Sequence, residues 1–193
     1  MSKKGRAISF SIVSLICCAI IAYGVLSFST ETINEKVYPL KYSETVDKVC
    51  KERNLDPSFI YAVIKTESNF DENAVSPANA KGLMQIMPDS FSWIQRYEDG
   101  EVTYEEDDLF KPEINIKYGC AIFQYFYERY EDEYTAAAAY NAGPGNVDSW
   151  LSNSEYSLDG KTLYNIPFTE TRNYVKKIKD IQNEYIELYF KEE

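Results

Sequence analysis

Carboxylates are the side chains in this sequence best suited to acid–base catalysis, because its 193 residues include no histidine. That absence excludes Ser-His-Asp triads, Cys-His dyads and His-ligated zinc sites. One acid has an unusual position. Ile60, Val63 and Ile64 define an apolar helix face, and Glu67 occupies the next position on that face. Burial raises the pKa of a carboxyl group, so Glu67 could stay protonated near neutral pH and act as a general acid. By spacing alone, a frayed helix end reaching solvent or a basic partner explains it equally well.

The helix that carries Glu67 has a clear start signal. Asp56 is a good N-cap, and Pro57 suits the first helical position. An earlier short helix is predicted around Val46, Val49 and Cys50. It should end at Asn54, so two helices meet just before the candidate acid.

The rest of the domain also has helical spacing. A helix is predicted over 88–97, with Phe91 and Ile94 inward, and a long one opens at Pro112. A helix containing 136–139, four alanines, should stop at 143–145, Gly-Pro-Gly, and the last helix should begin near Thr169 as its N-cap. No strand pattern is convincing in the core. The sequence predicts an all-α domain of about six to eight helices.

A strongly acidic stretch, Glu98 to Asp108, separates two of these helices. We interpret it as a solvated loop. A calcium site is the less favoured alternative, because the acids lack the alternating ligands and central glycine of an EF-hand loop. We expect no metal site and no cofactor.

The N-terminus carries a membrane signal. Residues 1–6 are basic, and residues 7–30 contain no charge and are long and apolar enough to span a bilayer. We expect a single-pass anchor at 7–30, a stalk at 31–42 and a catalytic domain at 43–193 outside the cytoplasm. A cleaved signal peptide, which would make the domain secreted, is the alternative.

The four cysteines divide into two pairs. Cys17 and Cys18 lie in the apolar segment and make a poor lipoprotein signal, whereas Cys50 and Cys120 lie in the expected domain. The second pair could form a disulfide in an oxidising exterior, and two buried free thiols are equally compatible with the sequence.

Composition limits the classes of molecule that the protein could bind. The net charge of −11 argues against nucleic acid. Seventeen tyrosines, ten phenylalanines and two tryptophans exceed what a core of this size needs, and exposed rings could stack on sugars, although core packing accounts for most of them.

Three separated segments, in order, resemble the catalytic domain of the soluble lytic transglycosylases. The first is Glu67-Ser68, followed by Ser76-Pro77 and 82–88, Gly-Leu-Met-Gln-Ile-Met-Pro. The second is 139–145, Ala-Tyr-Asn-Ala-Gly-Pro-Gly, and the third is 166–175, Ile-Pro-Phe-Thr-Glu-Thr-Arg-Asn-Tyr-Val. The resemblance covers roughly residues 43–190. Lys111 departs from it, because the family commonly has Asp or Asn there, which puts a local helix cap in doubt but not the site.

The resemblance implies a helical, lysozyme-like fold and a catalytic glutamate at Glu67, held by Tyr174. It also implies that sugar-binding positions line a cleft: Ser76, Gln85, Met87, Tyr140 and Asn141. Without the resemblance, we would interpret Met87 and Tyr140 as core, Ser76 as a turn residue, and Gln85 and Asn141 as helix-end hydrogen bonders.

The implied reaction is that of a lyase acting on polysaccharide. Family enzymes cleave the β-1,4 bond between N-acetylmuramic acid and N-acetylglucosamine in peptidoglycan and leave a 1,6-anhydro end. One glutamate acts as acid and then as base, where ordinary glycosidases need two carboxyl groups. We expect a monomer with peptidoglycan strands as partner, in possible association with cell-wall machinery.

Two alternatives stay open. A muramidase on the same fold would use water, which Asp71 or Glu72 could position. A non-catalytic peptidoglycan-binding scaffold would keep the cleft without the chemistry, although the presence of both Glu67 and Tyr174 argues against it.

Overall fold

The computed structural model describes residues 34 and 36–191 and divides the chain into two units, Met1–Leu40 and Lys41–Glu193. In the first unit, residues 34, 36 and 37 are helical. The expected basic N-terminus at 1–6, the apolar segment at 7–30 and the start of the stalk lie outside the described residues. Within the described part of the chain, no helix combines the length and the apolar character needed to cross a membrane.

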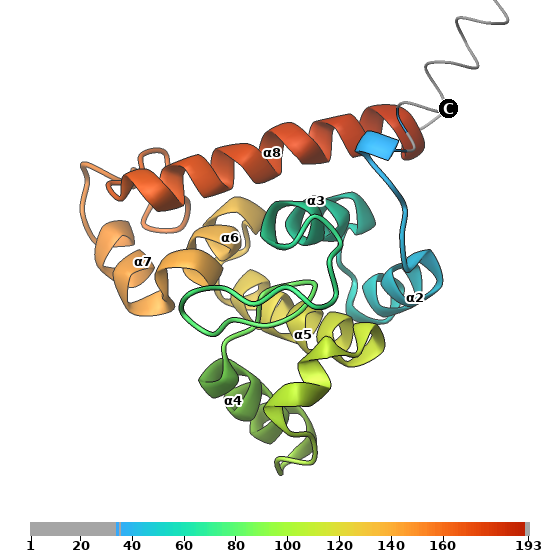
Figure 1. Ribbon diagram of the computed structural model, residues 1–193. Helices are drawn as coiled ribbons and strands as arrows, with labels where there is room; N and C mark the ends of the chain where they lie inside the picture. Colours follow the sequence, from blue (N-terminus) through green and yellow to red (C-terminus); the bar gives the residue numbers. More distant parts are fainter. Residues whose placement is uncertain (1–33, 35, 192–193) are drawn as a thin grey trace, which may run out of the picture. The chain divides into compact units, whose positions relative to one another are not determined.

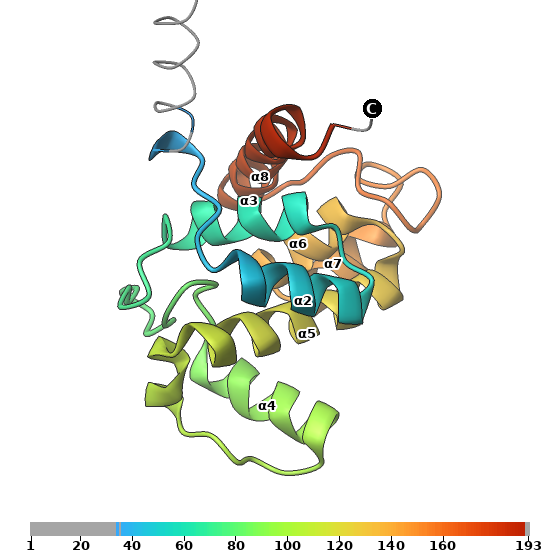
Figure 2. The ribbon, with the colours of Figure 1, turned by 90° about the vertical axis from the view of Figure 1, so that its right-hand side faces the viewer.

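The second unit is built from helices (Figures 1 and 2). They are α2 (Ser43–Arg53), α3 (Pro57–Glu67), α4 (Pro88–Asp99), the 3-10 helix η1 (Glu106–Phe110), α5 (Pro112–Tyr130), α6 (Glu133–Ala142), α7 (Pro144–Leu151) and α8 (Thr169–Tyr189). Helix α5 contacts α2, α4, α6 and η1, and α3 packs along α8. Among the described residues, β-structure is limited to two isolated bridges that join Lys81 to Val75 and to Ile86. The all-α prediction is therefore confirmed for this unit.

Most predicted helix starts are confirmed. The side chain of Asp56 accepts a 2.8 Å hydrogen bond from the amide of Ser58, and Pro57 follows it as the first helical residue. Asn54 ends α2 in the left-handed conformation, as expected. Asp56 and Asn54 satisfy backbone groups that a helix end would otherwise leave without a partner, whereas Pro57 has no amide hydrogen to leave unpaired.

Some boundaries differ from the prediction in part. Thr169 is the first residue of α8 and Phe168 is its N-cap. The predicted stop at 143–145 is confirmed, since α6 ends at Ala142 with Gly143 as its C-cap, but Pro144 also opens α7, a helix that the sequence did not predict, because its fixed φ angle suits a first helical position. The acidic stretch is only partly a loop, since Glu98 and Asp99 finish α4 and Glu106 starts η1.

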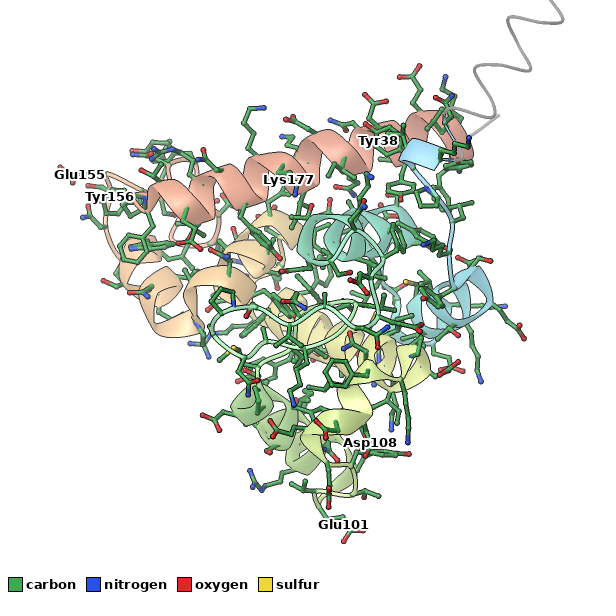
Figure 3. All side chains as sticks on the ribbon, viewed as in Figure 1. Tyr38, Glu101, Asp108, Glu155, Tyr156 and Lys177 are labelled. Carbon is green, nitrogen blue, oxygen red and sulfur yellow. The ribbon has the colours of Figure 1, made fainter. Side chains whose placement is uncertain are left out.

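The acids of that stretch are largely held by basic partners. Glu98 pairs with Arg53 at 2.6 Å, Asp107 with Lys81 at 2.8 Å and Asp108 with Lys111 at 2.7 Å. Glu101 and Asp108 lie at the end of this unit opposite α8 (Figure 3). Among the described residues, no group of three or more His, Cys, Asp or Glu side chains is placed to hold a metal ion.

The contact between α3 and α8 is aromatic and apolar. Tyr61 on α3 stacks on Tyr185 of α8 with ring centroids 5.4 Å apart, and both rings are buried. Ile60, Val63 and Ile178 are also fully buried. Burial of each such side chain stabilises the fold by about 1.5–3 kcal/mol, so α3 is held firmly against α8 along its length.

A buried asparagine fastens the loop between α3 and α4 to α5. The amide nitrogen of Asn115 donates to the carbonyls of Lys81 and Leu109 at 3.0 and 2.8 Å, and its oxygen accepts from the amide of Met84 at 2.8 Å. Gly82, at φ +74°, lies so close that a Cβ there would come within 2.2 Å of Asn115 Nδ2 and of the Leu109 carbonyl. A polar group buried with all its partners fixes the loop in one conformation.

Cys50 on α2 and Cys120 on α5 are buried free thiols. A hydrogen bond with Cys50, together with burial, raises the pKa of the Cys120 thiol well above its ordinary value. Of the two alternatives that the sequence left open, the structure has the reduced pair.

Candidate active site

Glu67 is the last residue of α3, and its side chain is half-buried. The three residues that share its helix face, Ile60, Val63 and Ile64, have no exposed surface. The helix therefore delivers one carboxyl from a fully apolar stripe to the edge of the loop between α3 and α4. A frayed end reaching out into solvent does not describe this residue.

Tyr174, in the second turn of α8, holds that carboxyl. Its hydroxyl donates a 2.6 Å hydrogen bond to Oε1 of Glu67, across 107 positions of sequence. The packing of α3 along α8 makes this contact possible. Burial and the neighbouring carboxyl raise the pKa of Tyr174 well above its ordinary value, so the phenol keeps its proton and acts as a donor.

The environment of Glu67 favours its protonated form. Desolvation raises the pKa of the carboxyl to about 7, outweighing the hydrogen bond from Tyr174 and the positive charge of Lys177, which both lower it. Lys177 lies one turn after Tyr174 on α8, and its Nζ donates to the backbone carbonyl of Thr66 at 3.3 Å. Figure 3 labels it on the α8 ribbon. At neutral pH the two forms of Glu67 are comparably populated, which suits a group that must give and then take a proton.

Tyr140, near the C-terminal end of α6, forms the next part of the site. Its hydroxyl donates to the carbonyl of Met84 at 2.6 Å, and its ring stacks on Phe123 with centroids 4.3 Å apart. Burial and the charge of Glu67 raise the pKa of this phenol well above its ordinary value. Tyr140 thus lies within the electrostatic reach of Glu67 while it ties α6 to the loop between α3 and α4.

Serine side chains shape this loop. The hydroxyl of Ser68 donates to the carbonyls of Leu83 and Ile64, at 2.8 and 3.2 Å. The hydroxyl of Ser76 accepts from the amide of Ala80 at 3.0 Å, which is the turn role that its position before Pro77 suggested. Both contacts fix the loop beside Glu67.

Gln85 holds the loop between α3 and α4 in place and also lines a pocket. Its backbone is left-handed, at φ +49°, and its amide nitrogen donates to the carbonyls of Ala74 and Gly82 at 3.1 and 2.9 Å. Left-handed backbone is uncommon outside glycine and asparagine, and it persists only where surrounding contacts enforce it. These two bonds are such contacts, and the same side chain also lines the pocket described next.

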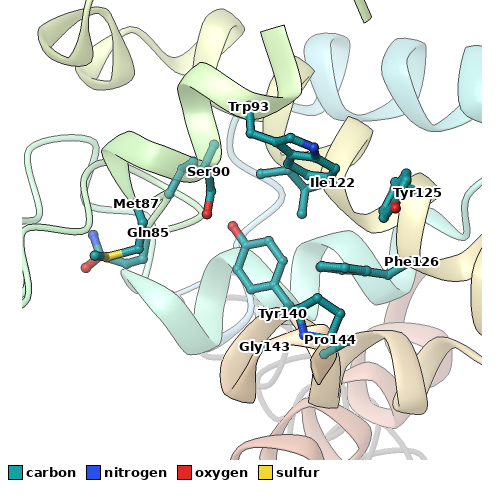
Figure 4. A pocket seen from close by; sticks show the side chains of 12 residues that line it. Gln85, Met87, Ser90, Trp93, Ile122, Tyr125, Phe126, Tyr140, Gly143 and Pro144 are labelled. Carbon is teal, nitrogen blue, oxygen red and sulfur yellow. The ribbon is translucent and has the colours of Figure 1, made fainter. Parts of the chain in front are cut away.

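A pocket of about 330 Å3 adjoins Tyr140 (Figure 4). Gln85 and Met87 border it from the loop, and Met87 is 41% exposed. Trp93 from α4 and Tyr125 from α5 form much of its remaining wall. Glu67 is not among the residues that line this pocket, but Tyr140 lines it and is close enough to Glu67 for the charge of that carboxyl to raise its pKa.

Asn141 is placed elsewhere. It is exposed and lines a second hollow, together with Ala142 and the segment 167–171 at the start of α8. The structure therefore brings Gln85, Met87 and Tyr140 to one pocket and puts Asn141 beside another. Ser76 lines neither of these two hollows.

The two acids that could position a water have other partners. Asp71 is exposed and accepts a 3.0 Å hydrogen bond from the amide of Asn73. Glu72 accepts a 2.9 Å hydrogen bond from the hydroxyl of Tyr42. Asp71 thus stabilises the turn after α3, and Glu72 ties that turn to Tyr42 at the start of α2.

Sequence reasoning missed Lys177 and the aromatic wall of the pocket. Helical spacing could have found Lys177 and the part of the wall on α4, but not its contact with Tyr125 on α5. Lys177 follows Tyr174 by three positions, and Ser90, Trp93 and Tyr97 share one face of α4 that differs from the inward face of Phe91 and Ile94.

Comparisons with known proteins identify lytic transglycosylases as relatives of this chain. The family model described as the transglycosylase SLT domain matches residues 44–163. A soluble lytic murein transglycosylase of Salmonella typhimurium is 35% identical over 146 residues, which cover 75% of this chain and 23% of that protein. A membrane-bound lytic murein transglycosylase C of Actinobacillus pleuropneumoniae is 28% identical over 171 residues, covering 77% of this chain and 46% of that protein.

The solved structures with a similar fold include lytic transglycosylases. An inactive mutant of lytic transglycosylase Slt from Pseudomonas aeruginosa superposes with a TM-score of 0.71 at 30% identity, over 80% of this chain and 25% of that one. The 70-kDa soluble lytic transglycosylase in complex with bulgecin A gives a TM-score of 0.73 at 29% identity, over 82% and 26%. The chain spans about a quarter of the length of these structures and of the Salmonella protein.

Proposed function

The chain belongs to the transglycosylase SLT domain family, and on that premise we propose that it is a lytic transglycosylase of peptidoglycan. Its substrate is the glycan strand, cut at the β-1,4 bond between N-acetylmuramic acid and N-acetylglucosamine. The observation that carries the proposal is the pair formed by Glu67 and Tyr174, a carboxyl with a pKa of about 7 that accepts a 2.6 Å hydrogen bond from a phenol.

In the first step, protonated Glu67 gives its proton to the glycosidic oxygen. The bond from that oxygen to the muramoyl C1 breaks, and the N-acetylglucosamine side leaves as an alcohol. Because Oε1 accepts from Tyr174, the proton to be transferred belongs on Oε2. The raised pKa makes this transfer possible at neutral pH.

In the second step, the Glu67 carboxylate takes the proton of the muramoyl C6 hydroxyl. The C6 oxygen bonds to C1, which closes the 1,6-anhydro ring and restores protonated Glu67 without consuming water. As the family resemblance implies, the substrate's own N-acetyl group stabilises the positive charge that develops at C1. Tyr174 and Lys177 both favour the carboxylate that exists between the two steps, since each lowers the pKa of Glu67.

The residues proposed to bind sugar lie on the loop between α3 and α4 and in the last turn of α6. Gln85, Met87 and Tyr140 supply a partly polar wall to one pocket, and Asn141, at the end of α6, supplies a polar group to the hollow beside the start of α8. Ser76 uses its hydroxyl oxygen as an acceptor for Ala80, which leaves the hydroxyl proton to be donated to a sugar. The fold that holds these residues is, by resemblance, lysozyme-like.

The proposed cellular arrangement rests on the sequence. An anchor at 7–30, a stalk at 31–42 and a catalytic domain from 43 to 193 would place Glu67 outside the cytoplasmic membrane, where peptidoglycan is found. The name of the Actinobacillus relative, a membrane-bound transglycosylase, supports such a tether in a similar protein.

Product analysis tests the proposed reaction. Purified glycan strands are incubated with the full-length chain, and the released fragments are examined by mass spectrometry. We expect muramoyl ends that are lighter by one water than reducing ends. Reducing ends alone would identify a muramidase, and uncut strands would support the scaffold alternative.

A further inference from the structure

The pocket beside Tyr140 has an ordered aromatic wall that the proposed chemistry does not use. Trp93 on α4 meets Tyr125 on α5 edge to face, with ring centroids 4.9 Å apart and planes at 81°. Tyr97 completes the group, at 6.1 Å from Trp93 and 5.2 Å from Tyr125. Three rings from two helices thus fix one another's orientation.

The wall is accessible. Tyr97 is 56% exposed, and Trp93 and Tyr125 are half-buried and line the same pocket as Tyr140, as Figure 4 shows. A large apolar surface left open and held rigid is costly in water unless it serves binding, and a rigid ring loses little entropy when a ligand stacks on it.

The lining identifies the chemistry of the occupant. Its polar side chains include Ser90, Gln85 and Tyr125, and no lining residue is charged. That neutrality is notable in a chain of net charge −11. An uncharged ligand with C–H faces and a few hydroxyl or amide groups fits such a surface, because the faces stack on rings and the polar groups bond at the rim.

Of the units of a glycan strand, N-acetylglucosamine has this character. N-acetylmuramic acid carries a lactyl group with a carboxylate or a charged stem peptide, for which the pocket offers no counter-charge. We propose that Trp93 and Tyr125 form a stacking wall that binds an N-acetylglucosamine unit of the strand beside the sugar at Glu67. This inference rests on the proposed function, because it takes peptidoglycan as the substrate.

The two tryptophans of the chain make a direct binding test possible. In a Glu67→Gln, Trp150→Phe variant, Trp93 is the sole tryptophan and no turnover occurs. Trp150 is buried against Phe168, so the exchange for phenylalanine keeps an aromatic ring there. We expect chitotetraose, an uncharged N-acetylglucosamine oligomer, to change the Trp93 fluorescence saturably. A response to stem peptide alone, with none to chitotetraose, would overturn the proposal.

A second measurement avoids the Trp150 exchange. Calorimetric titration of Glu67→Gln with chitotetraose is compared with the same variant carrying Trp93→Ala, Trp93→Phe or Tyr127→Ala. Loss of one stacking contact should weaken binding roughly three- to tenfold in Trp93→Ala. Trp93→Phe should retain most of the affinity. Tyr127, on α5 but lining a different pocket, is the matched control and should have no effect.

Kinetics on intact strands separates this inference from the proposed function. With Glu67 in place, Trp93→Ala should raise KM by a similar factor and leave kcat little changed, because the wall binds sugar away from the reacting bond. If the wild-type chain produces anhydro ends and Trp93→Ala has unchanged KM and chitotetraose affinity, the inference is wrong and the function stands. If the wild-type chain cuts nothing, the function itself fails.

Discussion

The hydroxyl of Tyr174 and the carboxyl of Glu67 form a 2.6 Å hydrogen bond that joins the start of α8 to the end of α3. The bond occupies Oε1, so it orients the carboxyl and directs the transferable proton to Oε2. It also lowers the pKa of Glu67, against the larger effect of desolvation, which raises it. The pKa of Glu67 is thereby kept near 7, where the carboxyl can both donate and accept a proton.

Removal of this hydroxyl should impair the reaction without removing the acid. We expect Tyr174→Phe to reduce kcat about ten- to hundredfold, the equivalent of one hydrogen bond to a charged group. It should also move the alkaline limb of the pH profile upward, because Glu67 loses a contact that favours its ionised form. Tyr130→Phe removes a 3.0 Å bond to Asp148 away from the site and serves as the control. An unshifted limb would contradict the assigned role of Tyr174.

The pH dependence of the wild-type chain follows from the same carboxyl. The free enzyme must hold Glu67 protonated, so kcat/KM should be constant below pH 7 and fall about tenfold per pH unit well above it, as one proton is lost. Rates of strand cleavage between pH 5 and pH 9 measure this directly. A limb near the ordinary carboxyl value of 4.5 would contradict the desolvation described here.

Lys177, on α8, should affect the alkaline limb of the pH profile. Its charge lowers the pKa of Glu67, so Lys177→Met should shift the alkaline limb upward, and added salt should reduce the difference from wild type. Lys176→Met is the matched control, since Lys176 is the preceding residue and pairs instead with Asp180. Equal profiles for the two variants would show that the charge of Lys177 does not reach the acid.

A pKa raised on folding also affects stability. The folded state binds the Glu67 proton more tightly than the unfolded state, so its contribution is fully present below pH 4.5 and is lost as the pH rises through 7. Glu67→Gln should therefore be more stable than wild type at pH 8, by about 1–3 kcal/mol after allowance for the partial exposure of the carboxyl. The difference should be much smaller at pH 4.

Urea unfolding of both proteins at the two pH values tests this. Glu184→Gln, which removes an exposed carboxylate from α8, controls for the loss of one negative charge. A stability difference that is the same at pH 4 and pH 8 would rule out a buried titration of Glu67.

Alanine substitutions at two glycines would distinguish the cost of backbone strain from the cost of a steric clash. Gly82 and Gly100 both have φ near +80°, at +74° and +82°, but a Cβ at Gly82 would meet the Leu109 carbonyl at 2.2 Å whereas at Gly100 it would meet nothing within 4 Å. Gly100→Ala should cost about 1 kcal/mol of strain, and Gly82→Ala about 3 kcal/mol or more. Denaturant midpoints compare them. Equal losses of stability in the two variants would mean that the loop at Asn115 shifts to accommodate the added Cβ.

Much of this molecule was predictable because its signals are local. Asp56 and Pro57 indicate the start of α3, and the spacing of Ile60, Val63 and Ile64 places Glu67 on a buried face. The absence of histidine leaves carboxylates as the side chains best suited to acid–base catalysis. The first two signals depend on neighbours within two helical turns, and the third on composition alone. The family motifs add the pairing of Glu67 with Tyr174 as an expectation, one that residue spacing alone could not supply.

Tertiary structure decided whatever depends on contacts between distant segments. The 2.6 Å bond between Glu67 and Tyr174 exists because α3 and α8 pack together, and the loop beside them is fixed by Asn115 from α5. Pro144 showed the limit of local signals, since proline can follow one helix or open the next. The aromatic wall of Trp93 and Tyr125 needed the packing of α4 on α5. Sequence period assigns a residue to a helix face, but only the assembled fold determines what that face meets.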